Sequence, residues 1–250
     1  MIASQPTWEE CNIRIAIFSD IHGNRHALEA MLADIDGQHP DQVYCLGDLV
    51  GYGAHPNEVI ELIHGRGIPT VMGNYDDGVG FDRDDCGCAY TDAEMRRLGD
   101  LSLRWSREHV TAGNKARLRA LVPSIRLEAA GVRLLLVHGS PRRMNEYVYE
   151  DRPLASLERV ARAAEADVLA FGHTHLPYVK PVAGVLLVND GSVGKPKDGD
   201  PRAAYALLDI GAEVKASIRR VAYDVAAAAA AVRASGLPAP FADMLEAARG

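Results

Sequence analysis

The sequence predicts an α/β fold in one large domain, with its strands in a mixed sheet or in two packed sheets. Three observations support this. With 250 residues and 48% hydrophobic content, the chain is long enough to bury a sizeable core. Short apolar runs alternate with helical patterns in the first third of the chain, as in βα units. Near the C-terminus several strand-like runs follow one another without helices, which indicates antiparallel pairing.

Strand and helix patterns alternate through the first 75 residues. The expected elements, in order, are a strand over 13–18, a helix over 26–35, a strand over 42–47, a helix over 56–65 and a strand over 68–73. Residues 77–130 then form a helical insertion within the domain. A Gly/Asp-rich stretch there is followed by two expected helices, 92–109 and 114–121. Two roles stay open for the insertion: a roof that selects substrate, and a contact in a homodimer.

Strands resume at 132–139, and a helix is expected over 153–166. The remaining expected strands are 167–172, 176–181, 184–189, 203–210 and 213–223. Residues 223–250 carry an alanine-rich helix that Gly236 and Pro238 stop, followed by a short second helix. The whole chain, 1–250, is therefore interpreted as a single domain.

Polar residues of metal-ligating type follow five of the apolar runs, each beside a Ser or Gly. They are Asp20 and His22, Asp48, Asn74, His138, and His173 and His175. Ligands bind at the carboxyl ends of strands in α/β sheets, where loops converge. Any one of these residues alone is an ordinary cap, turn residue or buried histidine. Seven such residues are more ligands than one metal ion binds, and they suit two ions that share a bridging Asp.

The motifs "DIH", "GD", "GN", "VHG" and "GHTH", in this order, resemble those of the calcineurin-like metallophosphoesterases. The resemblance runs from about Ile13 to the C-terminus. The stretches "DIHGNRHALEAMLADI" and "NDGSVGKPKDGDPRAAYALLDI" are more narrowly similar to the YfcE-type phosphodiesterase branch. The resemblance implies a four-layer α/β/β/α sandwich of two mixed sheets.

The same resemblance implies the ligand sets and the activity. One metal would be held by Asp20, His22, Asp48 and His175. Asp48 would bridge to a second metal, completed by Asn74, His138 and His173. The implied enzyme is a metal-dependent phosphoric ester hydrolase that cleaves phosphodiesters or phosphomonoesters by attack of a hydroxide bridging the two ions. Mixed nitrogen and oxygen ligands favour manganese, with iron, zinc and nickel open.

One position departs from the family pattern. Many members have "GNH" where this chain has "GNYD", so Tyr75 replaces a histidine that acts on the leaving group. Tyrosine is a poorer acid at neutral pH, because its reference pKa is about 10. We therefore expect Asp48, Asn74 and Tyr75 to be catalytic, with aryl esters and phosphoanhydrides reacting faster than alkyl monoesters. A role of Tyr75 in packing alone stays open. A second departure is Asp190 in place of the usual proline, and neither of these residues is an expected ligand.

Candidates for contacts to the substrate phosphate are Asn24, which we favour first, Arg202, and the pair Arg142 and Arg143. The four cysteines are too few for a disulfide scaffold. Cys45 lies in an apolar strand, and Cys11 stands alone. Cys86 and Cys88 could bind a soft metal or form a redox pair, although no second pair at zinc-ligand spacing accompanies them.

Composition argues against several partner classes. The net charge of -7 disfavours nucleic acid and anionic membranes as main partners. No apolar run approaches the roughly 20 residues that span a bilayer. The N-terminal stretch lacks the pattern of a signal peptide, so a cytoplasmic location is expected.

Two alternatives to a two-metal hydrolase are open at this stage. The first is a non-catalytic metal-binding scaffold or regulatory module on the same fold, resembling the retromer scaffold subunit. A complete set of seven ligands favours catalysis, whereas a large exposed apolar patch without turnover would favour the scaffold. The second, a metallo-β-lactamase-like hydrolase, is disfavoured because no "HxHxDH" cluster occurs.

Overall fold

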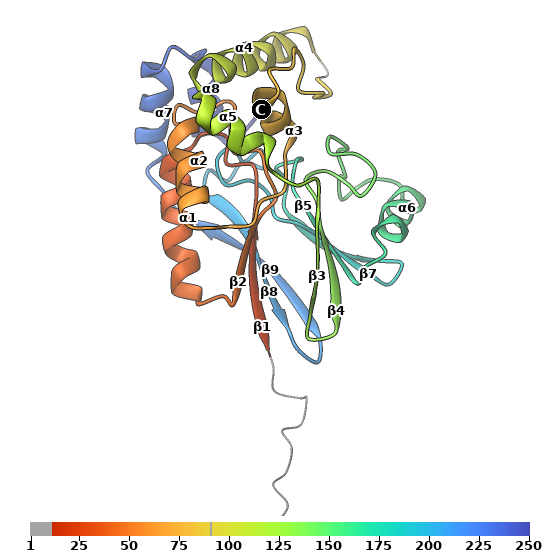
Figure 1. Ribbon diagram of the computed structural model, residues 1–250. Coiled ribbons are helices and arrows are strands. Elements are labelled where there is room, and N and C mark those ends of the chain that lie inside the picture. Colours follow the sequence, from red (N-terminus) through yellow and green to blue (C-terminus); the bar gives the residue numbers. More distant parts are fainter. Residues whose placement is uncertain (1–11, 91) are drawn as a thin grey trace, which may run out of the picture.

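The computed structural model describes residues 12–90 and 92–250. Cys11 lies outside the described residues. The same holds for the N-terminal stretch from which we predicted that there is no signal peptide. Two mixed sheets form the centre of the molecule, and helices cover them (Figure 1).

The first sheet has four strands in the order β2-β1-β8-β9. Its strands are β1 (Ile13–Phe18), β2 (Gln42–Cys45), β8 (Ala203–Ile210) and β9 (Val214–Val221). β1 and β2 pair in parallel through the crossover helix α1 (Arg25–Gln38), whereas β8 is antiparallel to both β1 and β9. The antiparallel pairing expected from the closely spaced C-terminal strands is therefore confirmed.

The second sheet has five strands in the order β3-β4-β5-β7-β6. Its strands are β3 (Ile125–Ala129), β4 (Val132–Leu136), β5 (Val168–Phe171), β6 (Tyr178–Val182) and β7 (Val185–Asn189). The three central strands β4, β5 and β7 are parallel, and the outer strands pair antiparallel. β5 and β7 are apolar along nearly their whole length because both of their faces are covered.

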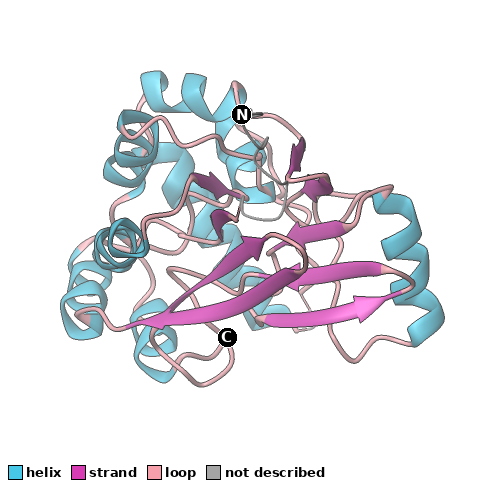
Figure 2. Ribbon diagram, turned by 90° about the horizontal axis from the view of Figure 1, so that it is seen from below, coloured by secondary structure: helices cyan, strands magenta, loops and turns pink. Residues whose placement is uncertain are grey.

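The alternating residues of the strands divide the core into layers. Ile15 and Ile17 of β1 face the second sheet, where they pack with Leu134 and Leu136 of β4, whereas Phe18 faces the helices. α1 lies on the first sheet, α7 (Val225–Ala234) packs against α1, and α6 (Leu154–Ala164) lies on the second sheet. In Figure 2 the strands lie between helices on either side. The four-layer α/β/β/α sandwich is confirmed.

Further helices gather above the strand ends in Figure 1: α2 (Pro56–Gly65), α3 (Asn74–Gly80), α4 (Ala93–His109), α5 (Ala112–Arg119) and α8 (Pro240–Ala247). Asp92 caps α4, as its sequence predicts, because its side chain accepts a hydrogen bond from the Met95 amide. Residues 77–130, assigned above to a helical insertion, contain α4, α5 and, at their end, β3 of the second sheet.

Two strand predictions need correction. β3 was not expected, because its five residues were assigned to the helical insertion, although they alternate between apolar and charged side chains as in a half-buried strand. It forms a hairpin with β4 through Ala130 and Gly131, both at positive φ. The strand expected over 68–73 makes only isolated bridges, at Thr70 and at Val71. Pro69 within it lacks the amide that a ladder requires.

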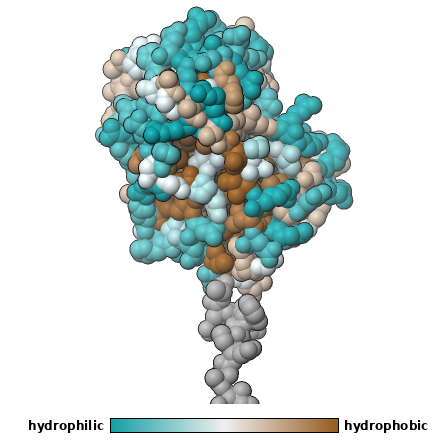
Figure 3. All heavy atoms as spheres, in the orientation of Figure 1, coloured by the Kyte–Doolittle hydropathy of each residue, from teal (hydrophilic) through white to brown (hydrophobic). Residues whose placement is uncertain are grey.

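An apolar groove of about 560 Å³ lies between β2, α2, α5 and the start of β3, lined by residues such as Tyr44, Ile68, Leu121 and Ile125. Figure 3 shows hydrophobic residues gathered on the middle of this face, between hydrophilic surroundings. Within the described residues, no helix is long and apolar enough to cross a membrane.

Candidate active site

All seven residues predicted as ligands are buried together where strands of both sheets end. Asp20 and Asp48 follow β1 and β2 of the first sheet, and His138 and His173 follow β4 and β5 of the second. Six of the seven form two clusters whose ligand atoms lie within 4.8 Å of one another: Asp20 with His22 and His175, and Asp48 with His138 and His173. The sandwich therefore brings the two sheets' ligands to one place.

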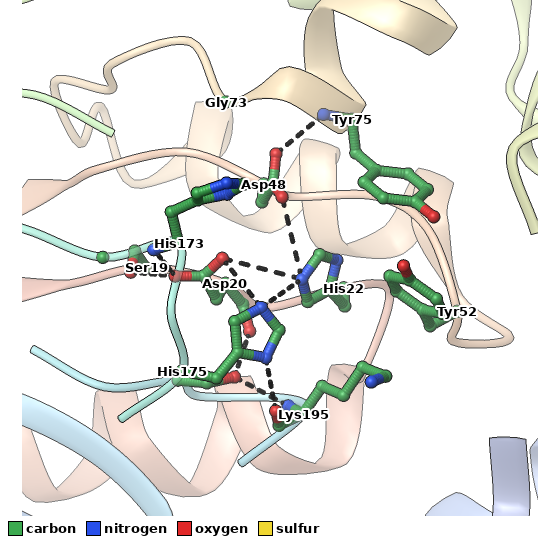
Figure 4. Close-up of polar contacts among 12 residues, drawn as sticks. Ser19, Asp20, His22, Asp48, Tyr52, Gly73, Tyr75, His173, His175 and Lys195 are labelled. Carbon is green, nitrogen blue, oxygen red and sulfur yellow. Dashed lines mark hydrogen bonds and ion pairs between the residues drawn. The ribbon is translucent and has the colours of Figure 1, made fainter. Parts of the chain in front are cut away.

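In the first cluster two imidazoles face each other. The Nε2 atoms of His22 and His175 are 3.2 Å apart, and Asp20 Oδ1 lies 3.6 and 3.3 Å from them (Figure 4). Each ring donates its Nδ1 hydrogen to a backbone carbonyl, that of Val50 or that of Lys195. In the neutral rings, both Nε2 atoms therefore direct lone pairs at the same point.

The second cluster is built in a similar way. His138 donates from Nδ1 to the carbonyl of Leu46, at 2.9 Å. Its Nε2 atom lies 3.2 Å from His173 Nδ1 and 3.1 Å from the amide oxygen of Asn74. Asn74, the seventh predicted ligand, thus joins this cluster through its oxygen.

Asp48 lies between the two clusters. Its Oδ2 atom is 3.7 Å from His22 Nε2 in the first cluster and 3.5 Å from His138 Nε2 in the second. Its Oδ1 atom accepts a hydrogen bond from the backbone amide of Tyr75 at 2.8 Å. One carboxylate oxygen is thereby fixed, and the other is shared by both clusters.

The donor atoms fit divalent cations. Asp20 Oδ1, in the first cluster, is buried and has no hydrogen-bond partner among the described residues, a costly state for a polar atom unless a ligand compensates it. Imidazole and carboxylate donors without thiolates suit first-row transition metals. The residues present therefore fit metal ions in both clusters.

The backbone of the site is held in an uncommon conformation. Five of the ligands have positive φ: Asp20, His22, Asp48, His173 and His175, between 49° and 65°. Non-glycine residues adopt this region at a cost, and such residues concentrate at functional sites. Hydrogen bonds between loops hold them there, including Asp20 N to the Gly47 carbonyl and His173 N to Asp20 Oδ2.

Comparison with known proteins agrees with this geometry. The calcineurin-like phosphoesterase superfamily domain matches residues 13–213. The chain belongs to this superfamily. An uncharacterized protein of Methanocaldococcus jannaschii is 33% identical over 228 residues, which are 84% of this chain and 88% of that protein. The phosphodiesterase YfcE of Escherichia coli K12 is 25% identical over 207 residues, 79% of this chain and 88% of its own length.

Two solved structures resemble the phosphoesterase along nearly all of its length. A metallophosphoesterase from Sphaerobacter thermophilus superposes with a TM-score of 0.76 at 30% identity, covering 95% of this chain and all of that chain. A hypothetical protein from Pyrococcus horikoshii OT3 superposes with a TM-score of 0.82 at 22% identity, covering 93% and 97%. The superfamily and the phosphodiesterase relatives support phosphoesterase activity, and hence a hydrolase.

The charges in the phosphoesterase site oppose one another. Burial alone would raise the pKa of Asp20, but the positive charge of the nearby His138 helps to hold that pKa well below its usual value. Burial lowers the pKa of His173 and of His175 to about 3, so both rings are neutral. Burial also opposes the charge on His138, but Asp48 and Asp20 outweigh it and raise that pKa to about 10.

The sequence analysis did not predict several residues that position the candidate ligands. The buried carboxylate of Asp76 accepts hydrogen bonds from the backbone amides of Asp48, Leu49 and Gly73, and it thereby fixes the Asp48 loop. The Ser19 hydroxyl contacts Asp20 Oδ2 at 2.6 Å and Asp190 Oδ1 at 2.7 Å. The serine beside Asp20 was visible, but only the fold brings Asp190 to it.

The predicted substrate contacts have other partners in the structure. Asn24 caps α1 with its oxygen and donates from Nδ2 to the carbonyl of Gly194. Arg142 forms an ion pair with Glu146, and Arg202 forms one with Asp200. Arg143 is exposed. None of these four side chains has a contact with a ligand side chain among the described residues.

Proposed function

We propose that the protein is a binuclear metal-dependent phosphoesterase, with one divalent cation in each cluster and Asp48 bridging them. The position of Asp48 Oδ2 between His22 and His138 carries this proposal. When bound, the two cations would generate a nucleophile from water near neutral pH and neutralise charge on the phosphoryl oxygens. Phosphodiesters and phosphomonoesters are both candidate substrates.

The chain's own residues would hold this arrangement before substrate arrives. Asp20 and Asp48 are both ionised, and His173 and His175 are neutral, which are the forms that metal binding requires. Hydrogen bonds to backbone groups fix each carboxylate and imidazole in place. Because two carboxylates only partly offset two divalent charges, the loaded site would stay positive and attract a phosphate ester.

Lys195 is the side chain we favour for contact with the substrate. Its backbone carbonyl holds His175, and its Nζ atom lies 4.7 Å from the centre of the Tyr52 ring. The side chain is buried, and among the described residues it has no ion-pair partner. Burial lowers the pKa of Lys195 well below its ordinary value, and a phosphate oxygen would stabilise the charged form. Arg142 and Arg202 already have carboxylate partners.

The structure supports a positioning role for Tyr75. Its hydroxyl lies 3.1 Å from the Tyr90 hydroxyl, and the edge of its ring packs against His22, with centroids 5.6 Å apart. Burial raises the pKa of Tyr75 well above its ordinary value, which makes it a still weaker acid. Without a strong acid here, the preference for aryl esters over alkyl monoesters remains part of the proposal.

The insertion would roof the second cluster. The side chain of Asn74 contacts residues 86 and 88 of the loop that leads into α4. Manganese remains the favoured metal, with iron, zinc and nickel as alternatives, because the amide of Asn74 is a weak, hard ligand.

The test is hydrolysis of bis-p-nitrophenyl phosphate and p-nitrophenyl phosphate by metal-stripped protein with Mn²⁺ added back. We expect metal-dependent turnover, and a loss of at least about 100-fold in kcat in Asp48→Asn, because the shared oxygen is lost. Asp100→Asn, at an exposed position on α4, is the matched control and should retain turnover.

The ratio of the two rates would separate diesterase from monoesterase activity. Folded, metal-loaded protein without turnover on either ester would contradict the proposal. It would favour the scaffold alternative, for which the apolar groove near β2 offers a contact surface.

A further inference from the structure

Cys86 and Cys88 lie side by side in the loop between α3 and α4. Their Sγ atoms are 2.6 Å apart. Gly87 between them has φ of +70°, a left-handed conformation that brings the two flanking side chains together. The loop is held from both sides, because Gly87 donates to Asp85 and accepts from the side chain of Asn145. The two thiols therefore meet without any large movement of the backbone.

This pair touches the second metal cluster through Asn74. The side-chain amide of Asn74 donates from Nδ2 to the Cys86 carbonyl at 3.1 Å and to Cys88 Sγ at 3.2 Å. Its oxygen faces His138 Nε2 at 3.1 Å. Partners of this kind fix the orientation of a metal ligand, and their loss typically lowers metal affinity 10- to 100-fold.

The two sulfurs differ in access. Cys86 is 7% exposed, whereas Cys88 is only half-buried, so a small reagent can reach the pair from the side of Cys88. Cys45 offers a contrast, because it is fully buried in the core of the first sheet without a second thiol beside it. Among the described residues, neither cluster able to hold a metal contains a cysteine, so a disulfide accounts for the pair better than a zinc site does.

We propose that Cys86 and Cys88 are a site of reversible oxidation that controls the second metal position; the inference rests on the proposed binuclear function. The oxidant is a low-molecular-weight disulfide of the glutathione type. One of the two sulfurs displaces one thiol from it, and the other sulfur then displaces the second thiol from that mixed disulfide. The two cysteines lose two protons and two electrons to form one S–S bond, and the reagent's bond is reduced to two thiols.

Closure of the disulfide removes a partner of Asn74. Cys88 Sγ becomes part of an S–S bond and turns toward Cys86. It thereby turns away from Asn74 Nδ2, from which it accepted a hydrogen bond. Of these two partners, the Asn74 side-chain amide then keeps only the Cys86 carbonyl. We expect the affinity for the second cation to fall about tenfold, with the first cluster, which Asn74 does not touch, unaffected.

The experiment measures Mn²⁺ binding by calorimetry in glutathione buffers of increasing oxidised fraction. Alkylation and mass spectrometry of the peptide holding residues 86 and 88 follow the thiols in the same samples. The expected result is loss of both thiols together with a roughly tenfold weaker second Mn²⁺ equivalent, reversed by dithiothreitol. The double variant Cys86→Ser, Cys88→Ser can form neither a mixed disulfide nor the internal bond, so its Mn²⁺ affinity should not differ between buffers. Cys45→Ala should respond as the unaltered chain does.

Two results would overturn the inference: both thiols still open to alkylation in fully oxidised glutathione, or a closed disulfide with unchanged affinity for the second Mn²⁺. Both readouts are independent of turnover. A chain that hydrolyses neither ester, yet binds the second Mn²⁺ more weakly when oxidised, would contradict the proposed function and support this inference.

Discussion

At the scale of single residues, each ligand histidine of the "DIH", "VHG" and final "GHTH" positions is oriented by a backbone carbonyl. His22 donates to Val50, His138 to Leu46 and His175 to Lys195. The motifs predicted which residues could be ligands, and the structure brings them together, because side-chain chemistry and strand-end position are both visible in a sequence. They could not predict these partners, since a carbonyl carries no sequence signal and its position depends on the fold.

The charge on His138 leads to a prediction about protons. Asp48 and Asp20 raise its pKa to about 10 in the metal-free protein against the opposing effect of burial, so the ring is protonated below that pH. A metal ligand must be the neutral ring. We therefore expect Mn²⁺ binding at pH 8 to release about one proton from His138, and the affinity for Mn²⁺ to rise about tenfold per pH unit up to pH 10.

Calorimetry in buffers of different ionisation enthalpy would count the released protons. In His138→Asn, whose side chain carries no proton to lose, the release should vanish. Equal proton release in this variant and in the unaltered chain would assign the proton elsewhere.

At the scale of elements, the candidate site is formed by residues that follow the strands and not by residues within them. The apolar runs predicted β1, β2 and β4 to β9, but not β3, whose side chains alternate in exposure and which depends on its hairpin partner. Contacts between strand ends could not be predicted either. Gly172, which follows β5, packs so closely on β1 that a Cβ atom there would lie 2.0 Å from Ser19 Oγ and 2.5 Å from Asp20 Oδ2.

Gly172→Ala should therefore separate the two sheets at the site. We expect the free energy of unfolding to fall by about 1–3 kcal/mol from overpacking, and Mn²⁺ affinity to fall because Asp20 is displaced. Gly37→Ala is the matched control. No atom lies within 4 Å of the Cβ that it adds in α1, so this variant should gain about 0.5–1 kcal/mol.

Urea denaturation of the metal-free proteins would measure both changes in unfolding free energy. A Gly172→Ala protein as stable as Gly37→Ala would show that the close approach of β1 and β5 is not maintained in solution.

At the scale of the whole molecule, the metal site joins the two sheets. Asp20, His22 and Asp48 come from loops of the first sheet, and His138, His173 and His175 come from loops of the second. A cation bound to residues of both halves is present only in the folded chain. The order of the motifs was enough to predict the α/β/β/α sandwich by resemblance. The substrate contacts stay a prediction, because the sequence does not show the partners that these side chains have in the fold, such as the carboxylates beside Arg142 and Arg202.

Metal removal should therefore lower the stability of the entire domain. Mn²⁺ at 100 times its Kd should add about 2.7 kcal/mol per site to the free energy of unfolding, which for a chain of this length raises Tm by roughly 5–10 °C. Thermal unfolding with and without a chelator measures the shift. Asp48→Asn should show less than half of the increase in Tm, and Asp100→Asn should show all of it. An equal increase in Tm in both variants would place the bound Mn²⁺ outside the two clusters.

The left-handed backbone of five ligands restricts how this site can change by mutation. Asparagine and glycine tolerate that conformation, whereas valine, isoleucine and threonine are disfavoured there by their branched side chains. At Asp20, Asp48 or His173, the backbone conformation therefore limits which residue types the fold accepts, whatever their charge. Descendants of this protein that abandon metal chemistry would keep their fold most easily through asparagine or glycine at these positions, and variant libraries that begin there will contain more folded proteins.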